Sequence, residues 1–183
     1  MANGTLKVSN IETSSGSGTI TIGQSGETIT IPSGATQTGI GGNNTPAFNA
    51  ESTGTMSVGS GNTWTKVTNL TVENFDTDSA YDTSNQRFTV PSDKAGKYLI
   101  SYGGQLNNSD RPDFILYKNG SAVNQTFIRG DNSGNTSDDN SIRGSVILDL
   151  AVADYLEIYA RTNTASSTAV QNASFSGMRL IGA

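Results

Sequence analysis

The side chains best suited to chemistry in this sequence are aspartates that gather in two polar segments. The two groups are Asp76, Asp78 and Asp82, and Asp131, Asp138 and Asp139. Two carboxyl groups about 5 to 10 Å apart are the machinery of a glycosidase, and Asp- and Asn-rich loops offer the hard oxygen ligands that calcium prefers. Neither group has the Asp-x-Asp-x-Asp-Gly spacing of a calcium loop, and nothing in the sequence locates a cleft. Solvated loop acids are therefore the expectation, and calcium is the alternative.

The composition removes most other kinds of catalysis. The chain has 183 residues with no histidine and no cysteine, which excludes Ser-His-Asp and Cys-His catalysis, disulfides, and zinc sites built from these ligands. The glycine-rich residues 39–42 precede no helical pattern, so no phosphate-binding loop is predicted. The 11 basic residues are scattered singly against 16 acidic ones, which argues against a nucleic-acid partner. We expect no enzyme, no cofactor and no catalytic residue.

Strands and turns must position these residues, because no stretch has sustained helical periodicity. From about Thr45 onward, short strand-like runs are separated by turn clusters, and Asn119-Gly120 is a hairpin signal. The expected strands are 46–50, 63–72, 86–90, 96–106, 113–118, 122–128, 141–151, 155–161 and 173–181. Trp64, the only tryptophan, could stack on a sugar, but its place in a strand favours partial burial. The pattern predicts an all-β sandwich or barrel.

Apolar residues with period two predict which side chains face the core. The expected core residues are Phe88, Tyr98, Ile100, Tyr102, Leu116, Leu148, Leu150, Leu156, Ile158, Phe175 and Leu180.

Residues 1–42 form a separate arm rich in Ser, Thr, Gly and Ile, ahead of a head over residues 43–183. The arm repeats a Thr-Ile-Thr-Ile motif at 19–22 and 28–31, with a turn at 23–26. This alternation is typical of a strand with one apolar face, but two such strands are marginal alone in water. Sister chains or a partner surface would have to complete them, and a flexible linker is the alternative. The residues expected to make these contacts are Ile20, Ile22, Ile29 and Ile31.

Several motifs of the head follow one another in a specific order. Phe75-Asp76 precedes Phe-Thr-Val-Pro at 88–91 and Gly-Lys-Tyr-Leu-Ile-Ser-Tyr at 96–102. Next come Leu-Tyr-Lys-Asn-Gly at 116–120, a stretch at 144–158 with Leu-Asp-Leu and Asp-Tyr-Leu-Glu-Ile, and Phe-Ser-Gly-Met-Arg-Leu at 175–180. In this order they resemble the C1q domain of the C1q/TNF family, from about Thr45 to the end of the chain.

The resemblance implies a jelly-roll sandwich of about ten strands that works as a homotrimer, with apolar and aromatic residues filling its threefold axis. C1q-like heads sometimes bind calcium near the trimer apex. This sequence has Ala153 where the family usually has glycine, and it has no collagen-like Gly-X-Y stalk.

A second resemblance lies in the arm. Gly-Thr-Leu-Lys-Val-Ser-Asn-Ile at 4–11 and Gly-Thr-Ile-Thr-Ile-Gly at 18–23 are similar to the N-terminal leader of small structural proteins of tailed phages, particularly marine ones. This resemblance implies a virion protein made in the host cytoplasm. Residues 1–10 carry no signal-peptide pattern, and no apolar run is long enough to cross a bilayer.

The function we predict is that of a phage virion structural protein, a homotrimer anchored by its arm with an outward C1q-like knob. Tail fibre or spike and capsid decoration or head fibre remain alternative locations. Partners would be sister chains, other virion proteins and a host glycan or receptor, but no nucleic acid and no membrane interior. The apical loop residues expected to touch the host are Asn107, Asp110, Asp131, Asp138 and Asp139. The alternative function is a free carbohydrate-binding lectin or adhesin.

Overall fold

In the computed structural model the chain divides into two units, Met1–Ile40 and Gly41–Ala183. The structure describes residues 9, 11–13, 18–30, 44–59, 61–107, 111–130, 140–162 and 168–180. In the first unit, the N–H of Glu27 donates to the carbonyl of Gln24 at 3.0 Å and closes the expected turn. Residues 18–30 contain this turn but no strand, because two segments this short hold a ladder poorly without further partners.

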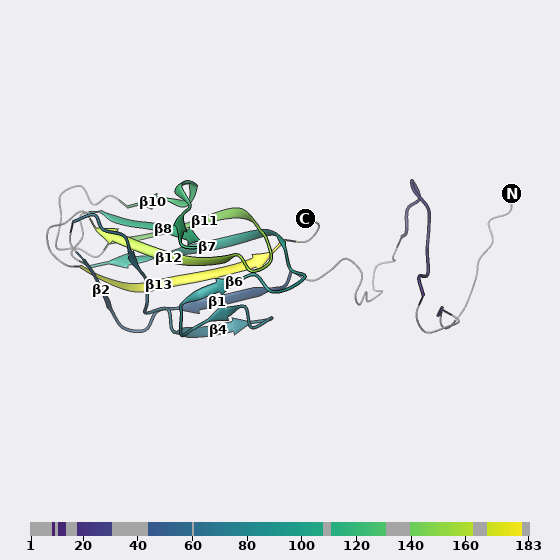
Figure 1. Cartoon of the computed structure of the whole chain (residues 1–183), viewed down its shortest axis with the longest axis horizontal. Coiled ribbons are helices and arrows are strands. Elements are labelled where there is room, and N and C mark those ends of the chain that lie inside the picture. The colour runs from purple at the N-terminus through teal and green to yellow at the C-terminus, as the bar shows by residue number, and fades with distance from the viewer. Residues whose placement is uncertain are drawn as a thin grey trace. The chain divides into compact units, whose positions relative to one another are not determined.

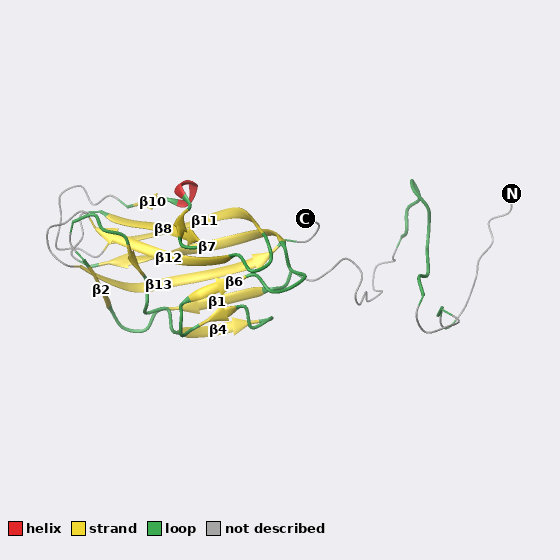
Figure 2. Cartoon of the chain, in the orientation of Figure 1, coloured by secondary structure: helices red, strands yellow, loops and turns green. Residues whose placement is uncertain are grey.

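The second unit is a sandwich of two antiparallel sheets, which carry nearly all of its regular structure (Figures 1 and 2). Within the described residues, sheet A has six strands in the order β11-β7-β13-β1-β4, with β2 paired to β13. Sheet B has seven, in the order β10-β8-β12-β6-β5, with β3 paired to β12 and β9 to β8.

The strands of sheet A are β1 (Ala47–Glu51), β2 (Met56–Val58), β4 (Val72–Asp76), β7 (Gly96–Leu106), β11 (Asn140–Leu150) and β13 (Thr168–Arg179). Those of sheet B are β3 (Thr65–Lys66), β5 (Tyr81–Asp82), β6 (Arg87–Thr89), β8 (Pro112–Lys118), β9 (Ser121–Ala122), β10 (Ile128–Arg129) and β12 (Tyr155–Thr162). A short 3-10 turn, η1 (Asn124–Thr126), lies between β9 and β10.

The core lies between the two sheets and is rich in aromatic rings. Phe48 of sheet A stacks on Phe88 of sheet B at a centroid distance of 4.6 Å. Phe175 meets the Phe48 ring edge-on at 5.0 Å, a geometry that aromatic pairs prefer. Burial of Tyr98 raises the pKa of its phenol to about 12, and the hydroxyl donates to the carbonyl of Lys94.

Most expected core residues are buried in this sandwich, and one is not. The buried ones are Phe88, Tyr98, Ile100, Tyr102, Leu116, Leu148, Leu150, Leu156, Ile158 and Phe175. Leu180 is only half-buried. Leu180 comes directly after β13. Side chains along a strand alternate between its two faces, so position 180 falls on the face opposite to that of the buried Phe175.

Two expected strands are broken in the structure. The run 63–72 splits into β3 in sheet B and the start of β4 in sheet A, and the chain crosses from one sheet to the other between them. Buried Val67 and Leu70 lie in that crossing, so their apolar character did not mark a strand. The run 122–128 contains η1, because the side chain of Thr126 accepts from the N–H of Leu116 and donates to the carbonyl of Val123.

Candidate interaction surface

The outward face of sheet A carries an apolar row across four strands. Strand register places Ile147 of β11 opposite Leu99 of β7, Leu99 opposite Met178 of β13, and Met178 opposite Ala47 of β1. Ile147 is 57% exposed and Met178 is 40% exposed. These side chains point outward because their neighbours along each strand, such as Leu148 in β11, fill the core. Contiguous exposed apolar side chains of this kind mark interaction surfaces.

A row of small polar residues lies beside the apolar row and ends at an exposed ring. Its members, strand by strand, are Ser145, Ser101, Ser176, Asn49 and Phe75. Phe75 lies on the edge strand β4 and is 51% exposed. A shallow pocket of about 180 Å³ lies between this ring and the side chains of Leu99 and Met178. The sheet therefore has an apolar side chain at the β11 edge and an apolar hollow towards the β4 edge.

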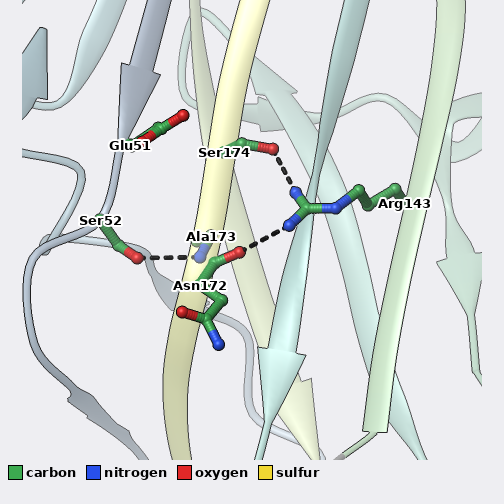
Figure 3. A pocket seen from close by; sticks show the side chains of 6 residues that line it. All are labelled: Glu51, Ser52, Arg143, Asn172, Ala173 and Ser174. Carbon is green, nitrogen blue, oxygen red and sulfur yellow. Dashed lines mark hydrogen bonds between the residues drawn. The ribbon is translucent and has the colours of Figure 1, made fainter. Parts of the chain in front are cut away.

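A third row, which contains Arg143, Ser174 and Glu51, lines a second pocket of about 220 Å³ (Figure 3). Arg143 of β11 reaches across to β13, where its guanidinium donates to the carbonyl of Asn172 at 2.9 Å and to the hydroxyl of Ser174. On the other side of β13, the hydroxyl of Ser52 accepts from the N–H of Ala173 at 2.8 Å. Glu51 lines the same pocket.

A β-bulge in β13 makes this polar pocket. The pairing of β13 with β7 shifts register between Gln171 and Ser174, and Asn172 takes a left-handed φ of +49°. Asparagine tolerates that conformation better than most residues. Its amide donates to the side chain of Gln105 at 2.7 Å. The extra residue exposes the Asn172 carbonyl to Arg143, as bulges commonly redirect groups at functional surfaces.

The sequence-predicted contact residues fall in different places. Asn107 follows β7 and is half-buried, and its N–H donates to the carbonyl of Ala169 at 3.0 Å. Asp110, Asp131, Asp138 and Asp139 lie outside the described residues, as does Ile31. Ile20, Ile22 and Ile29 of the arm are 41%, 62% and 60% exposed. Asn107 is not a member of the apolar row on the outward face of sheet A.

The residues of the apolar row were missed because their partners come from distant strands. Ile147 did carry a signal, since it stands between the inward residues Val146 and Leu148 and so breaks the apolar-polar alternation. The register that aligns it with Leu99 and Met178 is not visible in the sequence.

The described residues contain no group of three His, Cys, Asp or Glu side chains that could hold a metal ion. In that part of the chain, no helix is long and apolar enough to span a membrane.

Comparison with known proteins identifies the class of fold. No protein-family model matches the sequence, and no curated protein matches it. Among solved structures, the globular domain of zebrafish complement 1qA protein is similar, with a TM-score of 0.57 at 16% identity over 74% of this chain and 97% of that one. Eiger TNF from S. frugiperda has a TM-score of 0.54 at 14% identity over 75% of this chain and 93% of that one. The fold is therefore a C1q/TNF-type jelly roll.

A third similar structure is the PRD1 vertex protein P5. Its TM-score is 0.57 at 15% identity, and the match covers 76% of this chain and 99% of that chain. At these sequence identities the structural similarity establishes the fold alone.

Proposed function

We propose that this protein is a phage virion structural protein, a homotrimer whose jelly-roll head projects outward from a particle while its N-terminal arm anchors it. The main support for self-association is the apolar row on the outward face of sheet A. The row consists of Ile147, Leu99, Met178 and Ala47. When a sister chain covers an exposed surface of this kind, the assembly is stabilised by about 25 cal/mol for each Å² of apolar area removed from water.

The two ends of the face support a cyclic assembly. Ile147 lies on β11 and Phe75 on β4, which are opposite edge strands of sheet A. When Ile147 of one copy enters the hollow beside Phe75 of the next, each copy uses two different patches. Such a head-to-tail contact generates a ring when the rotation closes, and the resemblance to the C1q/TNF family favours three copies.

Two further observations support the virion role. The similar structures include a vertex protein of the phage PRD1, which the match covers almost completely. The arm presents exposed isoleucines at 20, 22 and 29 that its own unit does not bury, so a partner is needed to cover them.

The self-association is tested by an Ile147→Asp variant and by mass measurement in solution. The wild-type protein should have three times the 19.1 kDa mass of one chain. The variant should run as a folded monomer, because a charge buried in an apolar contact is costly when unpaired. The matched control is Val152→Asp, which alters an exposed apolar residue in the turn after β11 and should stay trimeric. A folded wild-type monomer would contradict the proposal.

The virion role is tested separately by searching purified particles for this chain. Its presence in stoichiometric amounts is the expected result. Absence from the particles, together with binding of the free protein to glycans, would favour the alternative of a soluble lectin or adhesin.

A further inference from the structure

The outward face of sheet B carries an arginine cluster around one buried carboxylate. The Asp113 side chain is 1% exposed and accepts from Nε of Arg129 at 2.9 Å and from Nε of Arg161 at 2.8 Å. Nε of Arg111 lies 3.8 Å from the same carboxylate. Among the described residues, three guanidinium groups surround this one carboxylate, so positive charge is concentrated here in a chain whose net charge is −5.

Two aromatic rings are interleaved with these guanidinium groups. Trp64 and Phe127 meet edge-on at a centroid distance of 6.0 Å. The Arg161 guanidinium lies 4.3 Å from the centre of the Trp64 ring and 5.5 Å from that of Phe127, and Arg129 lies 4.7 Å from the Phe127 ring. Cation–π contacts of this kind hold the guanidinium groups in fixed planes. We call these six residues the arginine–aromatic patch.

Three charged residues of the patch lie on paired strands of sheet B. Asp113 is on β8, and strand register places it between Arg129 of β10 and Arg161 of β12. The buried carboxylate accepts from Nε and Nη2 of Arg129 and from Nε of Arg161, so it occupies only one edge of each guanidinium group. The side chains of Arg111, Arg129 and Arg161 keep 30%, 41% and 22% of their surface exposed, and Phe127 keeps 36%. The cationic groups are therefore ordered before any ligand arrives, which reduces the entropy lost on binding.

We infer that the arginine–aromatic patch binds a sugar residue that carries one carboxylate or sulfate group. The planar guanidinium groups suit bidentate hydrogen bonding to such an anion. The partly exposed rings of Phe127 and Trp64 offer apolar surface for the C–H face of the sugar.

The charge distribution favours this ligand over a nucleic acid. A polyanion must lie along an extended surface, and this chain carries five more acidic than basic residues, so most of its length repels phosphates. A single acidic sugar needs only the local positive charge of the patch. A neutral sugar would leave the guanidinium groups without an anion and would bind more weakly.

Trp64 provides the measurement, because it is the only tryptophan in the chain and lies within the patch. Titration of the full-length protein with sialyllactose or with a sulfated disaccharide should change the Trp64 fluorescence and saturate, and lactose should give no saturable change. The two acidic probes distinguish a carboxylate from a sulfate ligand. An Arg129→Gln variant should weaken binding about tenfold, the usual effect of losing one charge-assisted hydrogen bond.

The matched control is Arg87→Gln at the other end of the same sheet face. Arg87 also bonds a buried carboxylate, that of Glu157 at 2.7 Å, and lies over the ring of Tyr155 at 3.8 Å, but it is not part of the patch. It should leave the affinity unchanged. Phe127→Leu keeps an apolar side chain and the Asp113 ion pairs, and it should also weaken binding, so the inference does not depend on the folding of Arg129→Gln alone.

Three results would overturn the inference. They are no saturable binding of either acidic probe, equal binding of lactose, and tighter binding of a single-stranded oligonucleotide than of the acidic sugars. The inference goes beyond the proposed function, because the patch lies on sheet B and the self-association face lies on sheet A. The Ile147→Asp variant should therefore bind the sugar as the wild type does, whether or not the protein is a trimer or a virion component.

Discussion

At the scale of single residues, Ala153 is the position where the chain departs from the pattern it resembles. It lies in the turn between β11 and β12 with a left-handed φ of +67°, which costs an L-residue other than glycine about 1 kcal/mol. The turn is nonetheless formed, since the N–H of Ala153 donates to the carbonyl of Val90 at 3.0 Å. The carboxylate of Asp154 also accepts from the N–H of Ala151 at 2.8 Å.

We predict that Ala153→Gly stabilises the head. Relief of the left-handed strain outweighs the added freedom of glycine in the unfolded chain, so the free energy of unfolding should rise by up to about 1 kcal/mol. Urea denaturation followed by circular dichroism measures the change. Ala151→Gly is the matched control, because that residue has no positive φ, and it should lower stability by about 0.5 to 1 kcal/mol. Destabilisation by Ala153→Gly would contradict the strain argument.

At the scale of elements, one carboxylate ties two short strands to a long one. Glu157 of β12 accepts from Nζ of Lys66 in β3 and from Nη2 of Arg87 in β6, each at 2.7 Å. Burial opposes the charge on Glu157, but the hydrogen bonds from Lys66 and Arg87 outweigh it and hold the pKa of its carboxyl below the ordinary 4.5. The strands β3 and β6 are only two and three residues long, so these contacts matter for their pairing.

The lowered pKa sets how the stability contributed by Glu157 depends on pH. The contribution is fully present above pH 4.5, the ordinary pKa, and is lost as the pH falls through the lower pKa of the folded state. Glu157→Gln should cost about 2 kcal/mol of unfolding free energy at neutral pH, and the gap to the wild type should close in acid. Thermal unfolding across pH 3 to 7 (roughly the carboxylate range) tests this. Asp93→Asn, at an exposed position, is the control, and it should leave the unfolding free energy at neutral pH unchanged.

The sequence predicted several long strands well, the start of β13 less well, and the short strands poorly. Strands such as β7 and β12 carry their own alternation, and β7 begins and ends where the pattern predicted. Short strands such as β2 and β5 hold too few residues for a pattern and form only because β13 and β6 supply ladder partners. The interaction face and the arginine–aromatic patch share this dependence. Arg129 and Arg161 look like isolated surface charges in the sequence, and only register gathers them around Asp113.

At the scale of the whole molecule, the two units differ in how they bury apolar side chains. The second unit encloses its own aromatic core between two sheets. In the described part of the first unit, Ile20, Ile22 and Ile29 keep about half of their surface exposed, from 41% to 62%. Their Thr-Ile spacing is that of strands, and a strand gains stability only when a ladder partner and an apolar surface are supplied. The partner that the proposed function provides is a sister arm or the particle.

Removal of residues 1–40 should therefore separate the two roles. The truncated chain should stay soluble and trimeric, because the core and the apolar row lie in the second unit, but it should no longer enter particles. The matched variant keeps the full length and replaces Ile20, Ile22, Ile29 and Ile31 by serine, so that length and flexibility are retained while the apolar contacts are removed. This variant should also be excluded from particles, which would show that the isoleucine side chains, and not the length of the arm alone, make the attachment. Particles assembled with each variant, purified and probed for the head, measure incorporation. Normal incorporation of the truncated chain would refute the anchoring role, and normal incorporation of the serine variant would show that the isoleucines do not make the attachment.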